Sequence, residues 1–200
     1  TDYYTRAMGA QRSTIQILRS FLSEAHFPLS HAVVVNDYEG ALRDHEAQDA
    51  VRWDRLMSAQ FPVTAWPVRG DVVPSTALVR IPKEKPALRF LVSGLSSVFP
   101  EISNVFFFGR NDEGIKSLPK TLNGMIGNTK TVLIKHRHRL VEAALLPSED
   151  TLEGWAMQQE ICLDEQILSW KTYPGLFAKG RLDRGTELFL EAFELPRRAQ

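Results

Sequence analysis

The 200-residue sequence contains a single cysteine, Cys162. One thiol cannot build an internal disulfide framework, nor a zinc or iron–sulfur site that needs several cysteine ligands. No apolar stretch reaches the roughly 18 residues of a membrane-spanning helix, and no charged segment followed by an apolar run marks a secretory signal. We therefore expect a cytoplasmic protein with no membrane partner.

A net charge is also missing, because 24 basic and 24 acidic side chains cancel. The balance conceals a gradient along the chain. Residues 110–145 hold seven basic and three acidic side chains, whereas residues 146–200 hold six basic and ten acidic ones. A basic middle section can present a basic face on a neutral molecule, although an uneven scatter of solvated charges explains the same counts.

Short apolar segments alternate with amphipathic ones through the first two thirds of the chain. The apolar segments predict strands at residues 31–36, 61–66, 76–81 and 105–108, and the others predict helices at 15–22, 41–58, 84–99 and 115–122. Strands that are apolar throughout need cover on both faces. The fold class is therefore α/β, a doubly wound and mostly parallel sheet of Rossmann-like type.

The pattern changes after residue 129. Residues 131–146 predict one long β-rich stretch, and residues 160–173 a strand pair around Asp164 and Glu165. Residues 183–194 predict a final amphipathic helix with Asp183 as its N-cap. We therefore expect antiparallel strands near the C-terminal end.

A doubly wound sheet binds cofactors beyond the carboxyl end of its first strand, where glycines let the backbone approach the ligand. Here that position reads Asn36-Asp-Tyr-Glu-Gly-Ala41, with one glycine. Tyr38 and Glu39 add bulk and negative charge where a tight turn is needed. We expect an ordinary turn and no cofactor in this domain; an atypical cofactor loop stays as the alternative.

No group of residues forms a recognisable catalytic constellation. A Gly-x-Ser-x-Gly elbow is missing, and Cys162 lies between Ile161 and Leu163 like a buried apolar residue. His136 and His138 could share a metal ion, but no third ligand accompanies them. The sequence predicts neither a catalytic residue nor a metal site.

Basic residues follow two neighbouring strands of the expected sheet. Because the carboxyl ends of parallel strands meet at one edge, these side chains can converge on RNA phosphates, with an asparagine to read a base edge. The candidates are Lys83, Lys85, Arg110, Asn111 and Lys116. The alternative is a pair of salt-bridged loops that use Glu84, Asp112 and Glu113 as counter-ions.

A second basic group occupies residues 135–139. Strand alternation places Lys135, Arg137 and Arg139 on one face, with His136 and His138 on the other. Three aligned cations suit a phosphate backbone, and a solvated face is the alternative.

Several segments together carry a family resemblance: Val33-Val-Val-Asn-Asp-Tyr-Glu-Gly-Ala-Leu42, Ala77-Leu-Val-Arg-Ile-Pro-Lys83, Val105-Phe-Phe-Phe-Gly-Arg-Asn-Asp-Glu-Gly-Ile-Lys-Ser117 and Thr172-Tyr-Pro-Gly-Leu-Phe-Ala-Lys-Gly-Arg-Leu-Asp-Arg-Gly-Thr-Glu-Leu-Phe-Leu190. They resemble the N-terminal half of bacterial ribosomal RNA guanine-N2 methyltransferases, of the small-subunit methyltransferase C and large-subunit methyltransferase G types. The last segment resembles the lead-in to the family's catalytic domain.

The resemblance implies two tandem methyltransferase-like domains. The C-terminal one binds S-adenosylmethionine and methylates a guanine amine of ribosomal RNA; the N-terminal one lacks the cofactor site, helps to bind RNA and supports its partner. On this basis residues 1–160 are the degenerate domain and residues 161–200 lead into a catalytic domain absent from this chain. Ile81-Pro82-Lys83 stands where an active copy carries an Asn-Pro-Pro-type motif.

The lead-in segment also suggests contacts with the missing domain. Phe177, Asp183 and Thr186 are candidates for the edge of that domain's cofactor pocket, with capping and packing of the last helix as the alternative. We expect no activity from this chain alone. Two other functions stay open: a self-sufficient methyltransferase with an atypical cofactor loop, and a purely structural domain without RNA contact.

Overall fold

The computed structural model of the chain describes residues 16–27, 29–36, 51–53, 73–163, 166–175 and 184–192. They belong to two compact units, residues 1–151 and 152–200, which we describe separately. None of the described helices is long and apolar enough to cross a bilayer.

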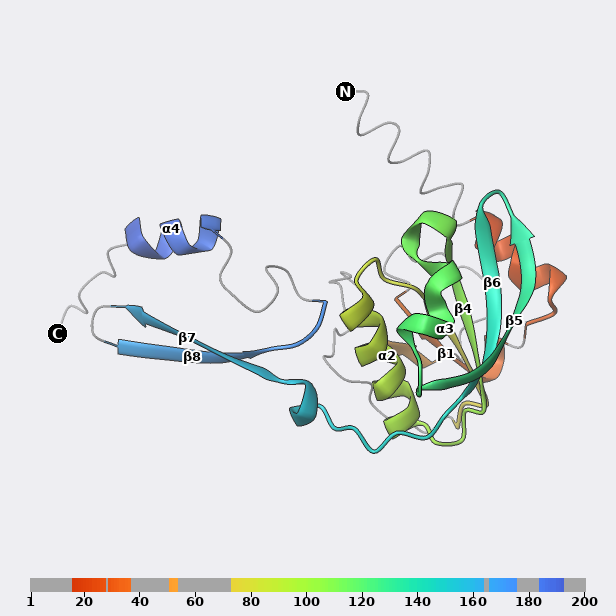
Figure 1. The fold of residues 1–200 in the computed structure, drawn as a ribbon, viewed down its shortest axis with the longest axis horizontal. Coiled ribbons are helices and arrows are strands. Elements are labelled where there is room, and N and C mark those ends of the chain that lie inside the picture. The colour runs from red at the N-terminus through yellow and green to blue at the C-terminus, as the bar shows by residue number, and fades with distance from the viewer. Residues whose placement is uncertain are drawn as a thin grey trace, which may run out of the picture. The chain divides into compact units, whose positions relative to one another are not determined.

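A six-stranded sheet forms the centre of the described part of the first unit (Figure 1). The strand order is β2-β1-β3-β4-β6-β5; β2, β1, β3 and β4 run parallel, and β6 is antiparallel to both β4 and β5. This confirms the mostly parallel α/β sheet with later antiparallel strands. The bounds are β1 Ala32–Val35, β2 Val51–Trp53, β3 Thr76–Arg80, β4 Asn104–Arg110, β5 Ile126–Lys135 and β6 His138–Leu145.

A helix over residues 16–24 covers one face of this sheet. Its Phe21 and Leu22 pack in one cluster with Val34 and Phe108. The Phe21 and Phe108 rings meet edge to face, with centroids 5.9 Å apart. Burial of such large aromatic rings contributes a large share of the apolar area that stabilises a core.

The helix α2, Lys85–Val98, covers the opposite face. Its Phe90 ring lies 6.5 Å from the ring of Trp53, and Trp53 is the register partner of Val35. Since side chains alternate along a strand, Val35 faces away from its neighbour Val34 and from the helix over residues 16–24. The sheet is therefore covered by helices on both sides, as a doubly wound fold requires.

Short helical turns join β4 to β5: η2 Asn111–Glu113, η3 Ile115–Ser117 and α3 Leu118–Thr121. The predicted helix around 115–122 is thus divided into a 3-10 turn and a single α-helical turn. Pro119 lies in the first turn of α3, where its missing N–H costs no helical hydrogen bond. Another 3-10 turn, η1 Leu29–His31, precedes β1.

The segment that follows β6 is fastened to α2 by three serines. The Ser93 hydroxyl donates to the Asp150 carboxylate at 2.7 Å, Ser96 to the Leu146 carbonyl at 2.6 Å, and Ser97 to the Asp150 carbonyl at 2.7 Å. These serines share one side of the helix because they are spaced three and four residues apart. They fix the path by which the chain leaves the first unit.

The described part of the second unit contains a two-stranded hairpin and a helix. β7 Met157–Leu163 pairs antiparallel with β8 Gln166–Thr172, and α4 spans Arg184–Ala192. The predicted strand pair and final helix are confirmed. A 3-10 turn, η4 Glu153–Trp155, precedes the hairpin, and Lys171 donates to the Glu153 carboxylate at 2.6 Å.

Three sequence predictions were wrong in detail. Residues 51–53 form β2 rather than helix, because pairing with β1 outweighs a polar, helix-like local pattern. β4 continues through Gly109 and Arg110 instead of turning at Gly109, because β6 pairs with both residues. The stretch 131–146 is no single strand, because it turns back at residues 136–137 to form the β5–β6 hairpin. The predicted strand 61–66 and the loop 37–41 lie outside the described residues.

Gly109 is the strand position where the fold most clearly requires a missing side chain. A Cβ built on Gly109 would lie 2.3 Å from Cγ1 and 2.6 Å from Cδ1 of the buried Ile81. We expect Gly109→Ala to lower the free energy of unfolding by about 1–3 kcal/mol, because it overpacks the site. Urea denaturation of the 200-residue chain measures the decrease.

A double-mutant cycle identifies the cause of that decrease. Ile81→Ala removes both contacting atoms, so the double variant should be destabilised clearly less than the sum of the two single variants. Gly127→Ala is the matched control, because a Cβ on Gly127 of β5 meets only Ala144, at 3.3 Å from its Cβ. Additive effects at residues 81 and 109 would contradict the proposed contact.

Candidate nucleic-acid interface

The β5–β6 hairpin ends in the two-residue turn His136–Arg137. Both residues have positive φ, 46° and 64°, as a type I′ turn requires. That turn reverses the chain between Lys135 and His138, which are register partners. The predicted alternation of Lys135, Arg137 and Arg139 on one strand face is therefore wrong. Arg137 lies at the tip of the hairpin, and Lys135 and Arg139 lie on different strands.

The tip is fastened to the loop that follows β4. The backbone N–H of Asn111 donates to the Arg137 carbonyl at 2.8 Å, and Nε of Arg139 donates to Oδ1 of Asn111 at 2.8 Å. These contacts arise from the strand register, which places Gly109 opposite Arg139. Asn111, a predicted base reader, thus uses its side-chain oxygen to hold an arginine.

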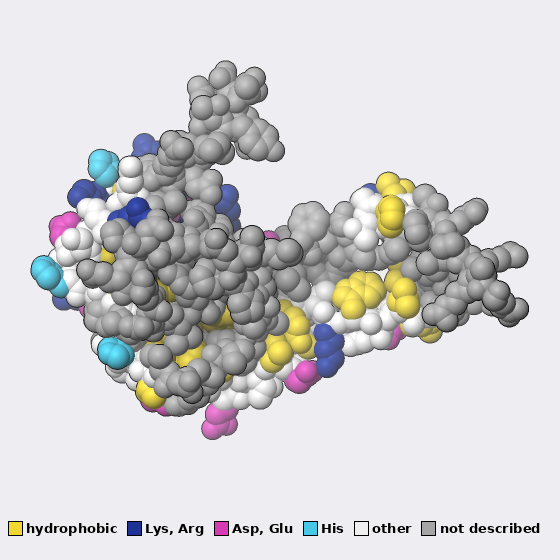
Figure 2. All heavy atoms as spheres, turned by 180° about the vertical axis from the view of Figure 1, so that it is seen from behind, with side chains coloured by type: hydrophobic (Ala, Val, Ile, Leu, Met, Phe, Trp, Pro, Cys, Tyr) yellow, Lys and Arg dark blue, Asp and Glu magenta, His cyan; other side chains and the backbone are white. Residues whose placement is uncertain are grey.

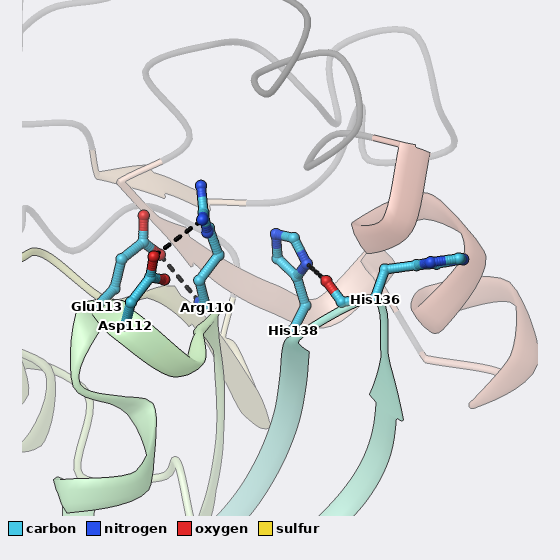
Figure 3. A network of polar contacts seen from close by, with 5 residues as sticks. All are labelled: Arg110, Asp112, Glu113, His136 and His138. Carbon is cyan, nitrogen blue, oxygen red and sulfur yellow. Dashed lines mark hydrogen bonds and ion pairs between the residues drawn. The ribbon is translucent and has the colours of Figure 1, made fainter. Parts of the chain in front are cut away.

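Arg110, the last residue of β4, has acidic partners in the following turn. Its guanidinium lies 2.9 Å from the Asp112 carboxylate, and its backbone N–H donates to Glu113 at 2.9 Å (Figure 3). The positive charge of Arg110 is therefore neutralised locally. The salt-bridged alternative holds for this residue.

His138 is buried beneath the turn, with 5% of its surface exposed, whereas Arg110, Asp112, Glu113 and His136, which form the cluster drawn around it in Figure 3, are not buried. Its ring stacks on Phe108, with centroids 5.6 Å apart and planes 12° apart, and its Nδ1–H donates to the His136 carbonyl at 2.8 Å. Burial lowers the pKa of His138 below its ordinary value of 6.5, and this effect prevails over the His136 hydrogen bond, which raises the pKa. The Arg110 charge lowers the pKa as well, against the Glu113 and Asp112 carboxylates, which raise it. A neutral imidazole follows at neutral pH.

The two histidines of the turn do not form a pair. In Figure 3 the His138 ring stands near Arg110, whereas the His136 ring points away from the cluster. Within the described ranges, no three His, Cys, Asp or Glu side chains are placed to hold a metal ion together.

The remaining basic candidates are exposed around the same end of the sheet. Lys135 donates to the Ser20 hydroxyl at 3.0 Å, which ties the tip to the helix over residues 16–24. Lys83 and Lys85 follow β3, and Lys116 lies in η3. Figure 2 shows basic and histidine side chains along the outer edge of the first unit, with acidic ones between them. Hydrogen bonds of Asn111 thus join the loop after β4, which begins at Arg110, to Arg137 and Arg139. The other three candidates, Lys83, Lys85 and Lys116, lie outside this network.

Asn36, at the end of β1, was not recognised as a site residue in the sequence. It is buried with φ at 62°, and its side-chain amide donates to the Arg80 carbonyl at 3.1 Å, across the carboxyl ends of β1 and β3. The available signal was its residue type, since asparagine tolerates a left-handed backbone better than most side chains.

Of the lead-in candidates, only Thr186 lies in the described part of the chain, where it is exposed on α4. Phe177 and Asp183 lie outside it, as does the side chain of Cys162. The backbone of Cys162 pairs with Ile167 in the β7–β8 hairpin.

No protein-family model matches the chain. It is 30% identical over 132 residues to the ribosomal RNA small subunit methyltransferase C of Alcanivorax borkumensis, with 64% of this chain and 39% of the relative covered. The protein of the same name from Hamiltonella defensa is 32% identical over 159 residues, which cover 74% of this chain and 44% of the relative. The one from Pseudomonas paraeruginosa is 29% identical over 168 residues, which cover 84% of this chain and 47% of the relative. The chain spans less than half the length of these curated relatives.

A solved structure shares the fold. The 16S rRNA N2 methyltransferase of T. thermophilus, determined with AdoMet and guanosine, superposes with a TM-score of 0.60 at 13% identity. The match covers 82% of this chain and 48% of that one. It shows that the sheet described above is a methyltransferase-type fold.

The lowered pKa of His138 predicts a pH-dependent stability. Between pH 6.5 and the lower folded-state pKa, the unfolded chain binds a proton that the folded chain does not, so the free energy of unfolding falls as the pH falls through this window. His138→Asn keeps a side-chain donor near the His136 carbonyl but cannot titrate. Urea titrations from about pH 7.5 to about pH 5 should therefore show a shallower decline for this variant, whatever its stability at the upper pH.

His136→Asn is the control, because it removes an exposed imidazole from the same turn at a position where asparagine tolerates the backbone. It keeps the buried His138 ring, so its decline should be steeper than that of His138→Asn. Equal declines for His138→Asn and the unmodified chain would show that His138 is not the responsible group.

Proposed function

Because this chain is homologous to bacterial small-subunit ribosomal RNA methyltransferase C proteins, we propose that it is the non-catalytic N-terminal domain of an S-adenosylmethionine-dependent rRNA (guanine-N2)-methyltransferase. In this role it assists binding of the RNA substrate and supports a catalytic domain. S-adenosylmethionine belongs to that second domain, ribosomal RNA is the partner, and the bacterial cytoplasm is the place of action.

The observation that carries the proposal is the position of Asn36. In the sheet, β2 lies on one side of β1, and the next strand along the chain, β3, lies on the other side. The topological switch point is therefore between β1 and β3. A doubly wound sheet binds its cofactor in the crevice at this point, where glycines leave room. Here the Asn36 side chain donates to the Arg80 carbonyl at 3.1 Å, between the carboxyl ends of β1 and β3. An asparagine with an internal hydrogen-bond partner thus stands at the end of β1, beside the position where a cofactor-binding copy carries its glycines.

The neighbouring strand pair supports the same conclusion. Ile81 directly follows β3, donates its backbone N–H to the Phe108 carbonyl at 2.9 Å and buries its side chain against Gly109. Transfer of a methyl group to an exocyclic amine needs polar groups that orient the amine. A buried isoleucine has none, and it stands where active copies of the family carry an Asn-Pro-Pro-type motif.

RNA binding is supported by the cluster at the β5–β6 tip. Arg137 is exposed at the turn, and its side chain makes no hydrogen bond or ion pair within the described part of the chain, while Lys135 is exposed beside it. Neutralising phosphates with such side chains releases counterions, which gives salt-sensitive affinity. The unit can therefore bind RNA although the whole chain has no net charge.

Two measurements on the 200-residue chain test the proposal. Calorimetric titration with S-adenosylmethionine should give no binding heat, and the chain with S-adenosylmethionine should transfer no methyl group to ribosomal RNA. Micromolar cofactor affinity or methyl incorporation would favour the self-sufficient methyltransferase instead.

Filter or fluorescence-anisotropy titration with ribosomal RNA should show binding that weakens with salt. Lys135→Gln combined with Arg137→Gln should lower the affinity and reduce the slope of log K against log salt by about 2, one for each phosphate that is no longer neutralised. Lys171→Gln, which removes one positive charge from an ion pair of the second unit, is the control and should leave both nearly unchanged. An unchanged affinity in the double variant would favour the purely structural domain.

A further inference from the structure

Hydrogen-bond donors predominate among the exposed side chains of the β5–β6 tip. Both carbonyl groups of the turn are occupied from the inside: His136 accepts from the His138 ring, and Arg137 accepts from the Asn111 backbone, each at 2.8 Å. The side chains that remain outside belong to Lys135, His136 and Arg137, which are all exposed. A surface of this kind matches a ligand rich in acceptors, such as phosphate and ribose oxygens.

The tip is also held in one conformation. His136 and Arg137 both occupy the left-handed region, which costs a side-chain-bearing residue roughly 1–2 kcal/mol. The Asn111 contacts, the stacked His138 ring and the bond from Lys135 to Ser20 hold the turn against this strain. A rigid tip suits a ligand whose own shape is fixed, because neither partner then loses much conformational freedom on binding.

Stacking surfaces for unpaired bases are scarce at the tip. Phe108 and His138 are buried and stack on each other. Among the described residues of the first unit, the exposed large apolar side chains are aliphatic. Proteins that hold single-stranded RNA use successive aromatic rings as platforms, and the tip offers one exposed imidazole, that of His136.

We propose that the β5–β6 tip recognises the phosphate and ribose edges of an RNA double helix rather than the bases of a single strand. The proposal rests on the RNA-binding role proposed above and names its substrate class. Helical RNA is recognised mainly by shape and by phosphate and 2′-hydroxyl contacts, which a rigid donor surface can supply.

The experiment compares three probes with the 200-residue chain: an RNA duplex, one strand of that duplex chosen to lack secondary structure, and a DNA duplex of the same sequence. We expect the RNA duplex to bind at least about fivefold more tightly than either of the others, because only it combines A-form shape with 2′-hydroxyls. The DNA duplex controls for phosphate density. Equal or tighter binding of the single strand, or of the DNA duplex, would overturn the proposal.

Variants of the turn separate the two modes of binding. Arg137→Gly relieves strain, so the folded chain should become more stable while its affinity for the RNA duplex falls several-fold. His136→Asn keeps a residue that tolerates the turn and one side-chain donor, but it removes the ring; it should lower duplex affinity less than Arg137→Gly does, because the Arg137 charge stays. A decrease of about tenfold or more in affinity for the single strand with His136→Asn would reveal base stacking and contradict the proposal.

The outcomes also separate this proposal from the function on which it rests. If none of the RNA probes binds, the RNA-binding role itself fails. If RNA binds but the single strand is preferred, the RNA-binding role stands and the duplex assignment is wrong.

Discussion

The position of β6 between β4 and β5 is the constraint on which the candidate interface depends. β6 is antiparallel to both neighbours, so its start lies beside the end of β4 and next to a tight turn from β5. This arrangement brings Arg110 opposite His138 and Gly109 opposite Arg139. Residues far apart in the sequence then meet with no long loop, and the hydrogen bonds through Asn111 follow from the register. If β6 were parallel to β4, its first residues would lie beside the start of β4, at the opposite end of the strands.

The carboxyl edge of the parallel strands is held by contacts within the chain. In a ligand-binding copy, small residues leave a polar crevice that the cofactor fills. Here the Asn36 amide donates to the Arg80 carbonyl beside the switch point, and the buried Ile81 packs against Gly109. The amide gives the Arg80 carbonyl a hydrogen-bond donor, and the isoleucine side chain is buried. Both residues therefore give this edge internal partners, as the proposed non-catalytic role requires.

The sequence was informative where one local pattern decides the structure. Continuous apolar runs located β3 and β4, and the apolar stripe of residues 84–99 located α2 within one residue at each end. The pattern was misleading where tertiary pairing decides. Residues 135–139 contain no Asn-Gly or Asp-Gly pair, which are the usual sequence signals of a two-residue turn. The alternation of basic and histidine residues therefore predicts one continuous strand where the chain turns. Likewise, Asn36 looks ordinary until β3 supplies the carbonyl that its side chain reaches.

A conflict between local preference and structure at the turn supports the role proposed for the tip. Glycine at position 137 would fit the left-handed backbone without strain, and asparagine would suit position 136. The chain instead has histidine and arginine there, with an exposed cation and imidazole at the cost of strain. Strained positions persist when surrounding contacts overdetermine them, and they concentrate at functional sites. The contacts around Asn111 and His138 meet that condition, which supports the polyanion contact proposed for the tip.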